Sequence, residues 1–418
     1  MRRPLKIVLL VLCAAAPVLL YGAEILFASA IFVDSSAPLW SIASASADTQ
    51  QDVAALAAST GAAFDIRNEL EVLKELREHR RDAAPALMVG YFLDARNKRS
   101  PIATDASLVP LGGISNTLTL LCNESGRYVT YDSDQHGFRN PPGMWRATKA
   151  DLAVVGESFT QGYCVPDGKG FVDLLRGAYP ITLNLGMSGQ SAVLQLAAIK
   201  EYLPRYAPRR LVWVYSEGID VQDLYKHFDD PILKQYLQPD FTQHLVNRQS
   251  EIDSTVRQYL AAAETRERRD REHPRPKAFS AAALSTIKLW RVRTVLAATR
   301  ADDQARSLGL LVDSHEYPMR QILQQAEALT RSWGGTMYFA YLPSWIRYRH
   351  QPRALDSEHA TIVKMVRELG IPLIDVQPAF DAQGDPLSLF PFRRFGHYNE
   401  NGNRIVADAI ANGLRIAD

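Results

Sequence analysis

The chain has 418 residues, of which 47% are hydrophobic and 22% are charged, as in a globular protein with a sizeable core. Its 47 Lys and Arg residues nearly balance its 46 Asp and Glu residues, which gives a formal net charge of +1 at pH 7. Because nucleic acid is held largely by an excess of positive charge, this balance argues against a nucleic-acid partner.

The amino-terminal residues predict membrane targeting. Three cations precede an apolar stretch, Ile7–Val33, that only Glu24 interrupts. A spanning helix needs about 20 apolar residues, whereas a cleavable signal has a core of about 7–15. Residues 1–33 are therefore predicted to be a signal anchor, which the long apolar run favours, or a signal peptide cleaved near Ala28–Ala30. In both cases the rest of the chain is exported to the periplasm or the cell exterior.

Two cysteines follow this segment, Cys122 and Cys164. An exported chain lies in an oxidising compartment, where a disulfide persists, so we predict a bridge between them, with two buried free thiols as the alternative. Their spacing does not match a zinc site, and no glycine-rich stretch matches a phosphate-binding loop. We expect neither a metal nor a cofactor.

Residues 34–147 form an extension whose role the sequence does not reveal. It begins with a small, polar, linker-like stretch, and helical spacing of apolar residues follows over 52–82. Residues 84–147 are rich in Gly, Pro and Asn, which predicts loops and short strands.

The domain over 148–418 shows apolar runs that alternate with helical patterns, which indicates a parallel sheet covered on both faces. Strands are expected over residues 151–156, 181–186, 210–216, 336–343 and 371–376. A helical insertion over about 222–333 interrupts this alternation. It contains a charged run, interpreted as a solvated helix face, and then a basic amphipathic stretch over 278–300 that packs on its own domain, lies on anionic lipid or forms a lid.

Ser158 directly follows the first of these strands, in "GESFTQG". A serine hydroxyl becomes a useful nucleophile only with a base within hydrogen-bond reach and with donors for the oxyanion. A sharp turn from strand to helix presents such a serine, and the flanking glycines permit the turn. Ser158 is therefore a candidate nucleophile, with an ordinary turn residue as the alternative.

Four blocks make the chain resemble the SGNH (GDSL-type) hydrolases, a family of serine esterases and acyl-transfer enzymes. These are "GESFTQG", "NLGMSGQS", "YSEGIDVQD" and "FGHYNENGNR", in the family's order, within residues 150–222 and 335–418. The resemblance implies a doubly wound parallel sheet of the flavodoxin-like α/β/α kind. It also implies Ser158 as the nucleophile, the Gly189 backbone N–H as an oxyanion donor and His397 as the general base.

Two blocks depart from the family pattern. Ile219 stands where an asparagine usually donates to the oxyanion, and a nearby Gln190 or a water is a possible substitute. Arg394 stands where the carboxylate that orients the base is usual. Asp385 and Asp220 are the candidates for that carboxylate.

A second histidine, His136, lies close to Asp134 in "SDQHGFRN", and this pair is a rival arrangement of base and carboxylate. A loop histidine of local structural role is the alternative for this residue. Its position before the predicted nucleophile strand, among turn residues, favours that alternative.

The function expected from the resemblance is that of a serine esterase or acyl hydrolase acting on ester bonds. The predicted export suggests acyl groups on envelope or extracellular glycans as the substrate. Two alternatives remain at this point. One is a non-catalytic protein that binds a glycan or a partner, suggested by the two departures, and the other is a membrane-associated O-acyltransferase, suggested by the anchor and the basic stretch.

Overall fold

The computed structural model describes residues 53–55, 57–59, 61–97, 108–220, 227–228, 230–273, 318–350, 353–394 and 396–416. Within these ranges, the residues of 45–265 and 310–418 belong to one compact unit. The predicted membrane segment and the basic stretch over 278–300 lie outside the described residues. In the part of the chain that is described, every helix is too short or too polar to cross a lipid bilayer.

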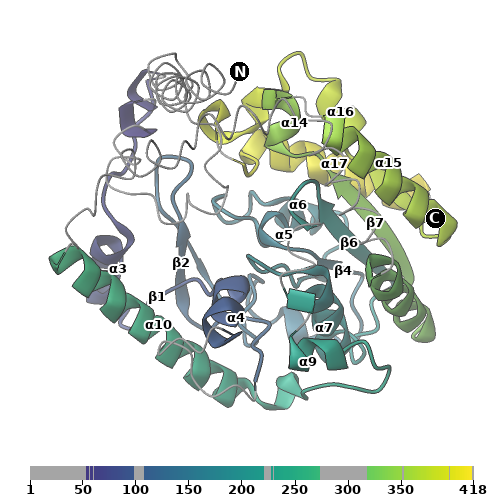
Figure 1. Ribbon diagram of the computed structural model, residues 1–418, viewed down its shortest axis with the longest axis horizontal. Helices are drawn as coiled ribbons and strands as arrows, with labels where there is room; N and C mark the ends of the chain where they lie inside the picture. Colours follow the sequence, from purple (N-terminus) through teal and green to yellow (C-terminus); the bar gives the residue numbers. More distant parts are fainter. Residues whose placement is uncertain are drawn as a thin grey trace, which may run out of the picture. The chain divides into compact units, whose positions relative to one another are not determined.

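A five-stranded parallel sheet forms the centre of this unit, with strand order β5-β4-β6-β7-β8 (Figure 1). The predicted parallel α/β fold is thereby confirmed. Its strands coincide with the predicted apolar runs: β4 (Leu152–Val155), β5 (Thr182–Asn184), β6 (Arg210–Ser216), β7 (Thr336–Leu342) and β8 (Leu373–Asp375). All four residues of β4 are fully buried, as expected of a strand covered on both faces.

Alternate residues of the central strands enter two separate hydrophobic cores. On one face, Ala153 and Val155 pack with α7 (Ala192–Tyr202), α15 (Arg353–Glu368) and a helix over 318–332. On the other face, Leu152 and Val154 pack with α6 (Phe171–Leu175), α16 (Gln377–Asp381) and α17 (Glu400–Ile416). Because side chains alternate along a strand, one apolar run supplies both layers of a three-layer α/β/α unit.

The described part of 34–147 adds a second, smaller sheet. Its strands are β1 (Ala84–Pro85), β2 (Leu118–Cys122) and β3 (Val129–Asp132), with β2 parallel to β1 and antiparallel to β3. Helix α3 (Glu69–His79) begins with a capping box between Asn68 and Glu71 and buries Val72 and Leu73.

A further helix in this region, α4 (Val89–Asn97), was not predicted. Val89, Phe92 and Leu93 are buried, and so is the cation Arg96, which forms an ion pair with Asp230. The helix is covered on more than one side. Its sequence therefore lacks the alternation of polar and apolar faces that marks a surface helix.

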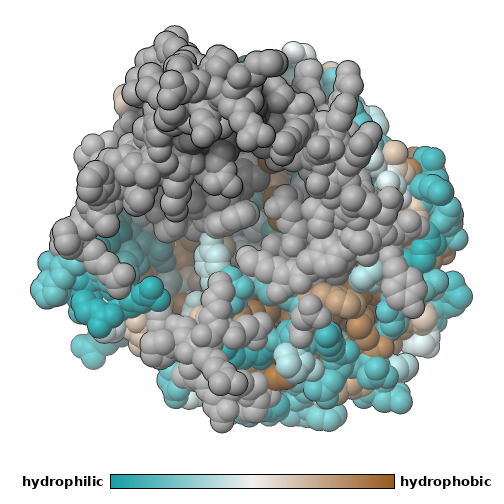
Figure 2. Space-filling model, viewed as in Figure 1, coloured by the Kyte–Doolittle hydropathy of each residue, from teal (hydrophilic) through white to brown (hydrophobic). Residues whose placement is uncertain are grey.

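The described parts of the predicted insertion include the helices α9 (Pro231–Gln235) and α10 (Gln249–Glu272), with turns between them. Helix α10 buries Ile252, Val256 and Leu260, which recur every four residues. Its last turns, from Arg266 to Glu272, are mostly charged and exposed, and the part of the helix visible in Figure 2 is hydrophilic. The charged run is therefore a solvated helix face, as predicted, over its described residues.

Candidate active site

Ser158 is the first residue of α5 (Ser158–Gln161), which follows β4 after a two-residue turn. It lies at the carboxyl edge of the parallel sheet, where folds of this kind place their sites. The turn needs glycine at position 156, because a Cβ there would lie 2.1 Å from the Thr160 hydroxyl oxygen. Ser158 itself is only 6% exposed, so its hydroxyl is held in a protected position.

His397 lies beside this serine, with Nε2 2.8 Å from the Ser158 Oγ. Its ring packs against Phe159 and Tyr163, whose ring centroids are 4.9 and 4.6 Å away. Two residues later, the Asn399 side chain accepts hydrogen bonds from the Asn401 and Gly402 amides at the start of α17. The last block therefore forms the start of α17, and its histidine side chain points toward Ser158.

Glu124 is the carboxylate that orients His397. Its two oxygens lie 2.9 and 3.0 Å from the His397 Nδ1, and the residue is largely buried. Asp385 and Asp220 do not take this role. Asp385 instead pairs with the exposed Arg393, and Asp220 accepts hydrogen bonds from the Ser216 amide and a buried glutamine.

Sequence reasoning missed Glu124 because it lies in the loop between β2 and β3, 273 residues before His397. No motif surrounds it. The two predicted carboxylates lie in the third block (Asp220) and ten residues before the last block (Asp385), whereas the loop between two strands of the smaller sheet supplies the observed one.

A disulfide between Cys122 and Cys164 confirms the predicted bridge. Cys122 is the last residue of β2, two positions before Glu124. Cys164 lies in the loop that follows the helix of Ser158. The bridge therefore links covalently the two segments that carry the carboxylate and the nucleophile.

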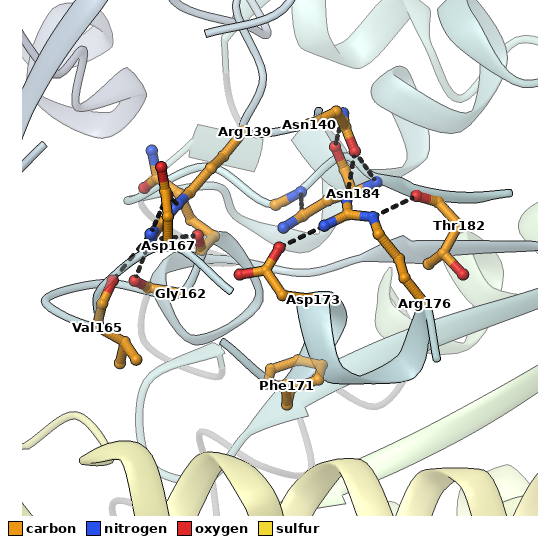
Figure 3. Close-up of polar contacts among 12 residues, drawn as sticks. Arg139, Asn140, Gly162, Val165, Asp167, Phe171, Asp173, Arg176, Thr182 and Asn184 are labelled. Carbon is orange, nitrogen blue, oxygen red and sulfur yellow. Dashed lines mark hydrogen bonds and ion pairs between the residues drawn. The ribbon is translucent and has the colours of Figure 1, made fainter. Parts of the chain in front are cut away.

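An arginine contacts the same loop, and the asparagine that follows it contacts the sheet (Figure 3). The buried Arg139 donates to the backbone carbonyls of Gly162 and Val165 and to the Asp167 carboxylate. Its neighbour Asn140 binds the backbone of Asn184 in β5, through both its donor and its acceptor. The "GFRN" stretch before β4 therefore holds the loop of Cys164 against the sheet.

Gly189 lies in the loop after β5, with φ of +77°, a conformation that favours glycine. Gln161 of α5 holds this loop, because its side-chain oxygen accepts hydrogen bonds from the Ser188 amide and hydroxyl. Close contact is possible since residue 186 is glycine: a Cβ there would lie 2.6 Å from the Gln161 nitrogen. Among the described residues, none accepts a hydrogen bond from the Ser158 or Gly189 amide, so both donors remain available to an oxyanion.

The third block ends β6 but provides no side-chain donor at the predicted position. Ile219 is partly buried and packs against the core that contains α17. The proposed substitute, Gln190, donates its side-chain amide to the Leu111 carbonyl at 3.0 Å instead. Glu217 anchors the block by accepting from Tyr341, the Ser344 amide and Arg347.

The rival pair lies elsewhere in the fold. The His136 ring packs between Trp145 and Tyr202, with centroid distances of 4.9 and 5.3 Å. Asp134 accepts hydrogen bonds from the His136 and Phe138 backbone amides and not from the ring, as in a turn. His136 is therefore a packed loop histidine, and burial lowers its pKa.

Charge at the site favours the protonated form of His397. Burial lowers the pKa of this imidazole, but the Glu124 carboxylate and, to a smaller extent, Glu157 raise it, so that the net pKa lies above its ordinary value. Burial also raises the pKa of the adjacent Tyr163 phenol, which therefore stays protonated. As a base, His397 must be neutral, so this environment places its working range at higher pH.

No protein-family model matches the sequence, and no curated protein does. Several solved structures are similar over most of their own length. A variant of an acetyl-xylooligosaccharide esterase from Geobacillus stearmophilus shares 15% identity with a TM-score of 0.34, over 64% of this chain and 95% of that one.

Two further structures are similar at the same level. A GDSL-like lipase from Bacteroides thetaiotaomicron shares 11% identity with a TM-score of 0.33, over 64% of this chain and 88% of its own. A member of the lipolytic protein G-D-S-L family from Veillonella parvula shares 14% identity with a TM-score of 0.30, over 62% and 96%. These three structures are, by their descriptions, a variant of an esterase, a GDSL-like lipase and a member of a lipolytic protein family.

Proposed function

We propose that the protein is a serine hydrolase that cleaves carboxylic esters. The observation that carries this proposal is the continuous series of hydrogen bonds from Glu124 through His397 to Ser158. A nucleophile, a base and an orienting carboxylate in this order are the arrangement that acyl transfer to serine requires. All three are largely buried, which strengthens their electrostatic interactions.

The reaction follows from the roles of the three groups. Ser158 Oγ attacks the ester carbonyl carbon and gives its proton to the His397 Nε2, while Glu124 holds the Nδ1–H and stabilises the imidazolium. The Ser158 and Gly189 amides donate to the oxyanion of the tetrahedral intermediate. His397 then protonates the departing alkoxide, and water repeats the sequence to release the acyl group.

We further propose that the substrate is an acyl ester on an envelope or extracellular glycan. This choice rests on the predicted export of the chain, which would place the site outside the cytoplasm, attached to the membrane or secreted. Small acyl esters on sugars offer the carbonyl that such a site attacks. The glycan itself is a matter for experiment.

Purified full-length protein assayed with a short-chain aryl ester and with acetylated oligosaccharides tests both proposals. We expect turnover that Ser158→Ala reduces to background, because no other hydroxyl contacts the His397 Nε2 among the described residues. Asp385→Asn is a matched control, since this carboxylate is exposed and pairs with Arg393. Wild-type turnover equal to that of Ser158→Ala would contradict the hydrolase.

One observation favours a second candidate, a glycan-binding protein without activity. The apolar Ile219 leaves the oxyanion site one donor short of the arrangement that the resemblance implies. Saturable glycan binding without turnover would support this candidate. Transfer of the acyl group to an added sugar, in preference to water, would instead identify an O-acyltransferase that uses the same three residues.

A further inference from the structure

Glu157 makes a contact that a serine, histidine and carboxylate series does not need. Its Oε2 lies 2.6 Å from the Ser158 Oγ. The His397 Nε2 lies 2.8 Å from the same Oγ. The residue is only 4% exposed. Two polar side chains therefore meet at one largely buried hydroxyl oxygen.

With a neutral His397 and an ionised Glu157, there are too few protons for each of these contacts to be a hydrogen bond. If His397 is neutral with its proton on Nδ1, it must accept the only proton of Ser158. An ionised Glu157 would then face the Ser158 oxygen with no proton between them, at a distance where a hydrogen bond is required.

With Glu124 ionised, two arrangements satisfy every contact. In the first, His397 carries protons on both nitrogens and donates to Glu124 and to Ser158, and Ser158 donates to Glu157. In the second, Glu157 is protonated and donates to Ser158, which donates to the neutral His397. Each arrangement holds one proton more than a neutral His397 beside an ionised Glu157.

We propose that Glu157 is a catalytic residue whose contact with the Ser158 hydroxyl keeps this additional proton in the resting site, and that the enzyme becomes active when the proton is lost to solvent. The proton opposes attack in both arrangements, because it occupies the base in the first and binds the attacking oxygen in the second. After its loss, the neutral His397 accepts the Ser158 proton as Oγ bonds to the carbonyl carbon. This inference rests on the proposed hydrolase function.

The groups that face His397 agree with this assignment. Glu124 contacts Nδ1, Glu157 lies beyond the serine, and the Tyr163 ring covers one side of the imidazole. Tyr398 packs on Phe159 next to the site, and burial raises the pKa of its phenol, so it stays neutral. The two carboxylates are the charged groups that act on His397, and both raise its pKa.

Glu157→Gln tests the proposal through the pH dependence of kcat/KM on an aryl acetate. The glutamine amide can donate to the Ser158 oxygen, which leaves the serine proton for His397 without an additional one. We expect the rise of kcat/KM with pH to begin about one pH unit or more lower than in the wild type, because a neighbouring charge at this range shifts a pKa by about 1–3 units. At high pH, where the wild type has also lost the proton, kcat/KM should reach a plateau in both proteins.

Two variants serve as controls. Asp385→Asn removes an exposed carboxylate and should leave the profile unchanged. Glu124→Gln should lower the pH at which kcat/KM begins to rise. It should also lower kcat/KM at high pH, because it removes the group that orients the imidazole. An unchanged onset in Glu157→Gln, or a folded Glu157→Gln protein inactive at every pH, would overturn the proposal.

A titration of His397 by NMR of labelled imidazole separates this inference from the proposed function. A lower pKa of His397 in Glu157→Gln than in the wild type supports the shared proton, even if no ester is turned over. The same pKa in both proteins overturns it. Absence of wild-type turnover bears only on the hydrolase.

Discussion

At the scale of single residues, Ile219 stands at the position where the resemblance implies a side-chain donor to the oxyanion. Its side chain packs in the core and offers no hydrogen-bond donor, and Gln190 is engaged with the Leu111 carbonyl. We expect Ile219→Asn to raise kcat with little change in KM, because the new donor acts mainly in the transition state. One such donor is worth up to about 10²–10³ in rate, and lost apolar packing reduces the gain.

Steady-state kinetics on an aryl acetate measure this effect. Ile219→Ala is the matched control, since it removes the same packing without adding a donor. The gain must also disappear when Ser158→Ala is combined with Ile219→Asn. A kcat for Ile219→Asn no higher than that of Ile219→Ala would show that the asparagine does not reach the oxyanion.

A second prediction about a single residue concerns Glu358 and the pH dependence of the free energy of unfolding. This carboxylate is fully buried and accepts from the Tyr215 hydroxyl at 2.7 Å and the Gly218 amide at 2.8 Å. Burial raises its pKa from 4.5 to about 7. The folded state therefore keeps a proton that the unfolded state releases, and this contribution to stability is present below pH 4.5 and is lost as pH rises to about 7.

Glu358→Gln should remove this pH dependence, because the amide oxygen still accepts both hydrogen bonds and does not ionise. The decrease in the free energy of unfolding between pH 5 and pH 8 should be smaller in the variant, by on the order of 3 kcal/mol. Urea unfolding at both pH values measures it. Glu368→Gln on the same helix is the control, since that exposed carboxylate has a lowered pKa and titrates below this range. Equal decreases in wild type and Glu358→Gln would contradict the assignment.

Local motifs predicted only part of the site. Ser158, Gly189 and His397 each lie in a short block next to a predictable strand or helix, so their positions follow from the parallel sheet. Glu124 has no such block, and its role depends on the packing of two segments far apart in the chain. Glu157 was visible in the sequence, but its contact with Ser158 depends on a side-chain direction that spacing does not give.

At the scale of elements, a disulfide joins the end of β2, next to Glu124, to the loop after α5, next to Ser158. A disulfide that closes a loop of 42 residues stabilises a protein by about 2–4 kcal/mol. We expect the Cys122→Ser, Cys164→Ser double variant to lose about that much stability. Its kcat should fall more than its KM changes, because Glu124 is then held less firmly against His397.

Reduction of the wild-type protein should reproduce the kinetic effect, with thiol labelling as the measure of how much bridge remains. Cys13→Ser is the control, as it removes the cysteine that is not in the bridge. Unchanged kcat after complete reduction would show that the bridge stabilises the fold without positioning the carboxylate.

The larger elements were predictable for a physical reason. Strands covered on both faces, such as β4 and β6, are apolar over most of their length, and this leaves a pattern in the sequence. Helix α4 leaves none, because it is buried on several sides and includes a paired Arg96. The smaller sheet consists of strands of two to five residues, which are too short for a periodic signal.

At the scale of the whole molecule, the cellular location remains a proposal that rests on the first 33 residues. Full-length protein should stay with membranes after alkaline carbonate washing, and external protease should digest its carboxyl-terminal part in spheroplasts. Both results follow if the segment is an uncleaved anchor with its cations in the cytoplasm. Recovery of a soluble form that starts near Ile31 would indicate a cleaved signal instead.

Glu124, Ser158 and His397 lie in this order along the chain, and the disulfide would hold the first two together if the backbone between them were cut. The carboxylate precedes the nucleophile, and the exposed Thr148 and Lys149 lie between them, before β4. A protease site engineered at this point would give a two-chain form, with Glu124 on one polypeptide and Ser158 on the other. The Cys122–Cys164 bridge would still join the two polypeptides, so we expect ester turnover to survive nicking and the pieces to migrate together on gels until a reductant is added.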